Sequence, residues 1–91
     1  MSKLEKLLEK LLGGNADRSF AFEDLRYVLL RLGFEEEINA GHHMFTLDGV
    51  DEQVNIQRMR FGKDAKPYQM RQVRKLILKY RLAEGGPDDE V

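Results

Sequence analysis

The fold is decided by residues 34–47, which read FEEEINAGHHMFTL. Apolar and charged or polar side chains alternate on both sides of the turn-prone segment Asn39-Ala40-Gly41. A period of two is the side-chain repeat of a strand, and a glycine-containing turn between two such runs predicts an antiparallel hairpin. A further alternating run at 53–57 follows the turn residues Asp48-Gly49. The sequence therefore predicts a three-stranded antiparallel meander.

Helical periodicity flanks this sheet on both sides. Residues 22–32 and 67–82 place apolar side chains three and four positions apart, with Gly33 after the first run and Pro67 at the start of the second. The order predicts an α+β domain at 19–82, in which two helices cover one sheet face. The other face stays open and carries His42, Met44, Thr46, Asn55 and Gln57.

Residues 1–14 read as an additional amphipathic helix, with a capping box at Ser2 and Glu5 and a stop at Gly13-Gly14. So short a helix is marginal alone, so its leucine stripe must pack on something. The stripe could cover its own domain, bind a dedicated partner, or form a homodimer through Leu4, Leu7, Leu8 and Leu11. Residues 83–91 read as an acidic flexible tail.

Composition excludes several classes of protein. The 91 residues permit one small domain, and the absence of cysteine excludes disulfides, thiolate zinc sites and a cysteine nucleophile. No apolar run is long enough to span a membrane and charged residues interrupt any signal-peptide core, so we expect a cytoplasmic protein. Without a glycine-rich phosphate loop or a metal-ligand cluster, we expect neither a cofactor nor a metal.

The net charge of −1 hides an uneven distribution. Residues 58–81 carry nine basic and one acidic side chain, whereas residues 1–57 carry six basic and eleven acidic ones. Binding of an anionic partner responds to local potential rather than to total charge. On the last helix the cations opposite the apolar stripe are expected to face outward. They are Arg71, Arg74, Lys75, Lys79 and Arg81.

The loop before the last helix is the stronger signal for nucleic acid. It contains Gly62 and the four cations Arg58, Arg60, Lys63 and Lys66. Such a loop beside an open sheet face suits a phosphodiester backbone, so these four residues are the candidate RNA- and phosphate-binding set. Phe61 and Tyr68 are either stacking surfaces or core anchors.

Strand alternation separates the two histidines. His42 points to the open face, whereas His43 shares a face with Phe45 and Leu47 and is expected at the edge of the core. Histidine is the side chain best suited to move protons near neutral pH, so His42 is the candidate general base or acid. The run 35–37, three glutamates, is expected as a solvated surface.

Several strings resemble the HicA (YcfA-like) family, the toxin components of bacterial and archaeal toxin–antitoxin pairs. They are FEDLR at 22–26, LGFE at 32–35, GHHMF at 41–45, NIQ at 55–57 and AKPYQMRQVRKLILKY at 65–80. The resemblance covers residues 19–82 and implies a double-stranded-RNA-binding-domain-like fold. It also implies metal-independent cleavage of messenger or other single-stranded RNA, and a HicB-like antitoxin that covers the active site.

The family motif Gly-Ser-His, often followed by a second histidine, begins the second strand and places the functional histidine at His42. This chain reads Ala40-Gly41-His42-His43, so the serine hydroxyl is missing. Three functions therefore stay open. The first is an mRNA endoribonuclease toxin with His42 as its catalytic residue. The second is a catalytically silent RNA-binding module of the same fold, and the third is a protein-interaction domain.

Overall fold

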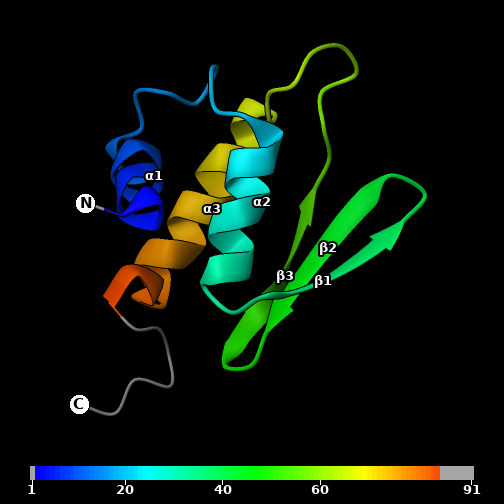
Figure 1. The fold of residues 1–91 in the computed structure, drawn as a ribbon. Coiled ribbons are helices and arrows are strands. Elements are labelled where there is room, and N and C mark those ends of the chain that lie inside the picture. Colours follow the sequence, from blue (N-terminus) through cyan, green and yellow to red (C-terminus); the bar gives the residue numbers. More distant parts are fainter. Residues whose placement is uncertain (1, 85–91) are drawn as a thin grey trace.

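The computed structural model describes residues 2–84, which form three α-helices and a three-stranded antiparallel sheet (Figure 1). The order confirms the α+β class. In sequence the elements are α1 (Lys3–Gly13), α2 (Phe22–Arg31), β1 (Glu35–Asn39), β2 (His42–Leu47), β3 (Val50–Ile56), α3 (Pro67–Lys79) and the 3-10 helix η1 (Leu82–Glu84). The expected tail, 83–91, lies outside the described residues except for its first two, which belong to η1.

The turn between β1 and β2 places His42 at the first position of β2. Ala40 and Gly41 form this turn with φ of 52° and 84°. Positive φ at both central residues is the requirement of a type I′ turn, whose twist matches that of a hairpin. Asn39 therefore pairs directly with His42 across the two strands.

The β2–β3 pairing brings His42 level with the start of the loop 58–66, the basic loop. Asp48-Gly49 is the turn, so β3 begins at Val50 rather than at the expected position 53. The expectation started too late because the exposed Asp51 and the half-buried Glu52 mask the alternation. His43 pairs with Ile56. By antiparallel register, His42 is then opposite Gln57, the last residue before the loop.

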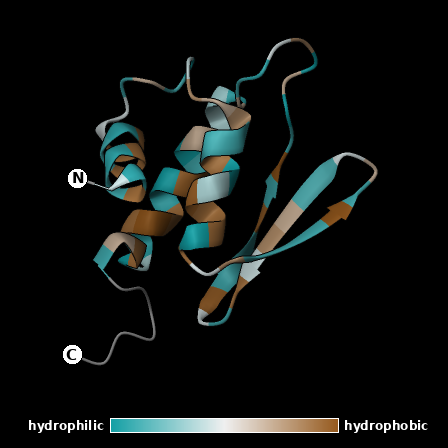
Figure 2. Cartoon of the chain, viewed as in Figure 1, coloured by the Kyte–Doolittle hydropathy of each residue, from teal (hydrophilic) through white to brown (hydrophobic). Residues whose placement is uncertain are grey.

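The helices α2 and α3 cover one face of the sheet, and α1 packs on the far side of these two helices (Figure 1). A single cluster of buried residues includes Leu11 of α1, Leu25 of α2, Phe45 of β2, Ile56 of β3 and Ile77 of α3. Figure 2 shows the apolar stripes of the helices where they meet one another. The helix α1 therefore shares its core with residues 19–82.

The leucine stripe of α1 covers its own chain. Leu8 and Leu11 are buried, and Leu4, Leu7 and Leu12 pack against the same core while partly exposed. The buried pair is consequently not available for the homodimer contact that the sequence allowed. The capping box is present as expected, with Glu5 and Ser2 exchanging two hydrogen bonds of 3.1 Å.

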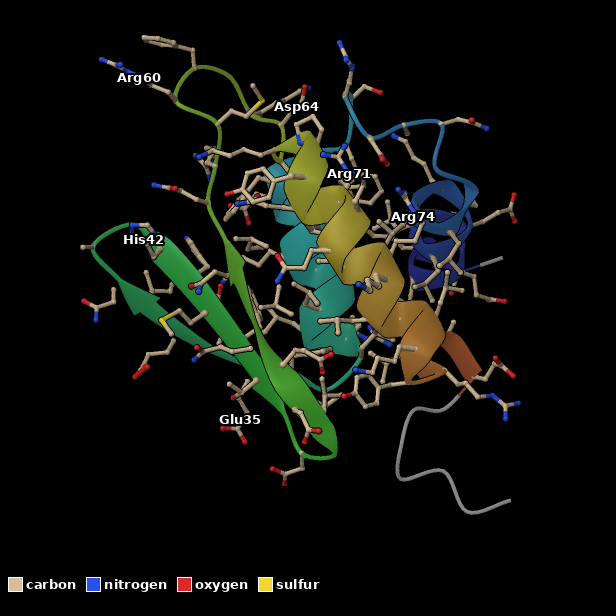
Figure 3. All side chains as sticks on the ribbon, turned by 180° about the vertical axis from the view of Figure 1, so that it is seen from behind. Glu35, His42, Arg60, Asp64, Arg71 and Arg74 are labelled. Carbon is tan, nitrogen blue, oxygen red and sulfur yellow. The ribbon has the colours of Figure 1, made fainter. Side chains whose placement is uncertain are left out.

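The cations of α3 do not all face outward, contrary to expectation. The side chain of Arg74 is only 19% exposed and donates to both carboxylate oxygens of Asp17 at 2.9 Å. Its Nη1 also donates to the carbonyl oxygen of Leu11 at 3.1 Å. A helical stripe predicts which face a side chain occupies, but the docking of α1 covers part of that face (Figure 3). Arg74 is therefore a structural residue.

Candidate nucleic-acid interface

His42 has the exposed position that alternation predicted. Its side chain is exposed at the end of the β1–β2 hairpin, and within residues 2–84 it takes part in no hydrogen bond or ion pair. An exposed imidazole without a partner keeps both ring nitrogens accessible to a ligand. This arrangement is suited to proton transfer with a bound molecule.

The basic loop closes on itself at its base. Arg58 and Ala65 form a bridge, and the backbone N–H of Met59 donates to the carbonyl oxygen of Asp64 at 3.2 Å. The loop projects from the sheet end beyond β3 (Figure 1). Its tip, residues 60–63, is thus carried on a hydrogen-bonded stem.

Two further hydrogen bonds attach this stem to the segment that enters α2. The backbone N–H of Phe22 donates to the carbonyl oxygen of Lys63, and that of Ala65 donates to the carbonyl oxygen of Phe20, both at 2.8 Å. Phe20, Phe22 and Ala65 are buried. The stem is therefore anchored in the core.

The four loop cations divide into two pairs. At the stem, Arg58 donates to Glu23 at 2.8 Å, and Lys66 donates to the side-chain oxygen of Gln57 at 3.3 Å. At the tip, Arg60 and Lys63 are exposed and form no ion pair within residues 2–84. All four lie in the loop that begins opposite His42, although no hydrogen bond joins any of them to His42 in the described part of the chain.

Gln69 positions the start of the loop, a role that the sequence analysis missed. Gln69 is 1% exposed. When its amide is flipped, so that both amide atoms find partners, the nitrogen donates to the Gln57 carbonyl oxygen at 3.1 Å and the oxygen accepts from the Gln57 N–H at 2.9 Å. These two hydrogen bonds join the backbone just after β3 to a side chain of α3. A glutamine among the apolar positions of the last helix was the available signal.

The open sheet face carries carboxylates along β1, from Glu35 at the end away from His42 to Glu37 at the middle of the strand. A shallow hollow there is lined by Glu35, Glu37, Met44, Thr46 and Gln53, together with part of Glu36. Figure 3 shows Glu35 and His42 at opposite ends of the hairpin. Because phosphates are repelled by carboxylates, a nucleic acid is disfavoured over this hollow.

Glu36 is largely buried, contrary to the expectation that the whole glutamate run 35–37 is solvated. Its side chain is 9% exposed and accepts two hydrogen bonds from Arg26, from Nε at 2.6 Å and from Nη2 at 2.7 Å. The Nδ1 atom of His43 lies 2.7 Å from its Oε2 atom. Arg26 foremost, and then His43, lower the pKa of Glu36 against the opposing effect of burial. The sequence signal for this burial was alternation, because Glu36 is two positions after Phe34 and so shares the core-facing side of the strand.

This ionic network continues to the basic loop. Arg26 also lies 3.4 Å from Glu23, which accepts the hydrogen bond of Arg58. The ring of Phe22 contacts His43 edge-on, with centroids 4.9 Å apart, and the Arg58 guanidinium lies 5.3 Å from the same ring. His43 is thus held at the core edge, as predicted, and faces away from His42.

Within residues 2–84 no three His, Cys, Asp or Glu side chains gather as metal ligands would. No helix in this part of the chain combines the length and apolar character needed to cross a bilayer. A comparison with family models, with curated proteins and with solved structures finds no match to this chain.

Proposed function

We propose that this protein is a HicA-type toxin with a double-stranded-RNA-binding-domain-like fold, which cleaves messenger or other single-stranded RNA without a metal. The observation that carries the proposal is the exposed, unpartnered His42, opposite the start of a loop that bears Arg58, Arg60, Lys63 and Lys66. The helix–three strands–helix order, with two helices on one sheet face, supports the fold assignment.

In the proposed reaction His42 acts as general base. It removes the proton of a ribose 2′-hydroxyl, the 2′-oxygen attacks the adjacent phosphorus, and the 5′-oxygen leaves, which produces a 2′,3′-cyclic phosphate. The loop cations stabilise the negative charge that develops on the phosphoryl oxygens. One imidazole cannot serve as base and acid simultaneously, so Lys63, Lys66 or water supplies the proton to the 5′-oxygen.

The same proposal includes a protein partner and a location. A HicB-like antitoxin would neutralise the toxin by covering His42 with acidic surface directed at residues 58–66. Charge complementarity favours such a contact, because Arg60 and Lys63 at the loop tip have no ionic partner within residues 2–84. A toxin that acts on messenger RNA would work in the cytoplasm.

The test is incubation of purified protein with RNA in the presence of a chelator, followed by detection of cyclic-phosphate ends. Replacement His42→Ala should lower the cleavage rate by about 10²- to 10⁴-fold, the usual contribution of acid–base catalysis. The circular dichroism and melting temperature should stay unchanged because the side chain is exposed. His43→Ala is the matched comparison, and it should lower the melting temperature. Unchanged cleavage by His42→Ala refutes the assignment of this residue.

One observation favours a second candidate, a catalytically silent RNA-binding module. Gly41 stands where the family has serine, and no residue among 2–84 orients the His42 ring. This module would bind RNA and yield no product. A domain that interacts only with proteins would show no RNA affinity even at low salt.

A further inference from the structure

Phe61 occupies an unusual position for a large aromatic side chain. It is 81% exposed at the tip of the basic loop, the highest value among the large apolar residues of 2–84. Gly62 follows with φ of 99°, a conformation that turns the chain sharply at this point. Core anchoring, one of the two roles the sequence allowed, is excluded for Phe61.

The stem that carries this exposed tip is held in place. Arg58 and Ala65 pair across the stem, and the carbonyl oxygen of Lys63 accepts a hydrogen bond from the core segment at Phe22. A ring carried on a fixed stem loses less conformational freedom on binding than a ring in an unanchored loop. The geometry therefore suits a binding residue.

The surroundings of the ring favour an anionic partner. The Arg60 guanidinium lies 5.4 Å from the Phe61 ring centroid, and Lys63 is exposed on the other side of Gly62 in the sequence. An aromatic ring among cations is the combination that binds single-stranded nucleic acid, in which bases stack on the ring and phosphates contact the cations. Insertion of the ring into an apolar pocket of a protein would be disfavoured, because it would desolvate these cations.

We infer that Phe61 stacks on an unpaired base of single-stranded RNA while Arg60 and Lys63 contact the flanking phosphates. This inference rests on the proposed RNA substrate but not on catalysis. The loop starts opposite His42, and four residues reach at most about 14 Å, so one short strand can contact both residues. In a duplex the bases are already stacked, so paired RNA cannot use the ring in this way.

The experiment measures binding in the His42→Ala background, so that cleavage does not interfere. Two fluorescent oligoribonucleotides of equal length and charge are compared, one with bases and one with an abasic stretch at its centre. Phe61→Ala should weaken binding of the base-bearing strand by about 5- to 100-fold. Binding of the abasic strand should change by less than about twofold. Phe61→Trp should retain full affinity because it keeps an aromatic ring.

Leu78→Ala is the matched control, since Leu78 is also strongly exposed (63%) but lies on α3 away from the loop. Its affinity for both strands should equal that of the parent. Wild-type affinity of Phe61→Ala for the base-bearing strand, or an equal loss for both strands, would overturn the inference. Absence of any RNA binding at low salt would overturn it as well. If the protein with His42 intact does not cleave RNA but the Phe61 effect on binding is present, only the catalytic proposal is refuted.

Discussion

At the scale of single residues, two adjacent histidines have opposite environments. His42 is exposed and unpartnered among the described residues, whereas Glu36 and Phe22 hold the His43 ring at the core edge. Strand geometry produces this difference because consecutive side chains point to opposite faces. Alternation alone predicted both positions. Alternation did not predict the ion pair between Arg26 and Glu36, because only the packing of α2 on the sheet brings these side chains together.

The Glu36 network should make stability depend on pH. Because the pKa of Glu36 is lower in the folded than in the unfolded chain, its contribution is present above about pH 4.5 and is lost as pH falls through the folded value. Glu36→Gln should lower the free energy of unfolding at pH 7 by about 1–3 kcal/mol. Urea unfolding of both proteins at pH 7 and pH 3 measures this difference, which should be smaller at the lower pH because the unfolded carboxyl is then protonated.

Glu35→Gln is the control for this prediction. Glu35 is the exposed neighbour of Glu36 on β1 and has no ion pair within residues 2–84. Its replacement should change stability by no more than about 0.5 kcal/mol at either pH. A Glu36→Gln effect of equal size at pH 7 and pH 3 would contradict the ionic explanation.

At the scale of elements, polar contacts between segments distant in sequence set the positions of the helices and the loop. Gln69 connects α3 to the end of β3, and Arg74 connects α3 to Asp17 and to the end of α1. Both side chains belong to α3, whose apolar stripe was predicted correctly. The stripe gives no information about these partners, because they approach only when the chain folds.

The Asp17–Arg74 pair should hold α1 on the rest of the fold. Both side chains are largely buried, at 16% and 19% exposed, and the arginine lowers the pKa of Asp17. Arg74→Met should cost about 2–3 kcal/mol, because it leaves a buried carboxylate without its partner. Asp17→Asn should also destabilise, and the double variant should show a coupling energy of about 1–3 kcal/mol.

Hydrogen exchange distinguishes this effect from general destabilisation. The amides of α1 should lose protection in Arg74→Met more than those of β2, which lies in the sheet. Lys75→Met, at the exposed neighbouring position, should leave both unchanged. Equal loss of protection across α1 and β2 would show that Arg74 does not specifically retain α1.

At the scale of the whole molecule, the electrostatic polarity is stronger than the net charge of −1 indicates. The loop cations lie at one end of the sheet, Glu35 lies at the other, and Glu37 lies at the middle of β1 beside the hollow on the open face. Such a distribution disfavours any anionic ligand over the hollow relative to the loop cations. The feature depends on the fold, because the acidic and basic segments are separate blocks in the sequence.

RNA binding should therefore depend strongly on salt. With about four phosphate contacts, the logarithm of the binding constant should fall with a slope of about −3 against the logarithm of salt concentration. The double variant Arg60→Gln/Lys63→Gln should reduce the slope to about −1.5. Lys6→Gln, an exposed position on α1, should leave it unchanged. A slope near zero for the parent protein would rule out the proposed phosphate contacts.

The sequence by itself determined the element order, the meander, the opposite directions of His42 and His43, and the block of cations at 58–66. These features follow from local periodicity and turn residues, which act within a few positions of the chain. Only the tertiary structure decided that α1 covers its own core, that Glu36 and Arg74 are structural, and that Phe61 is exposed on an anchored stem. The reason is physical: burial and ion pairing depend on which distant segments meet, and a one-dimensional pattern does not specify that.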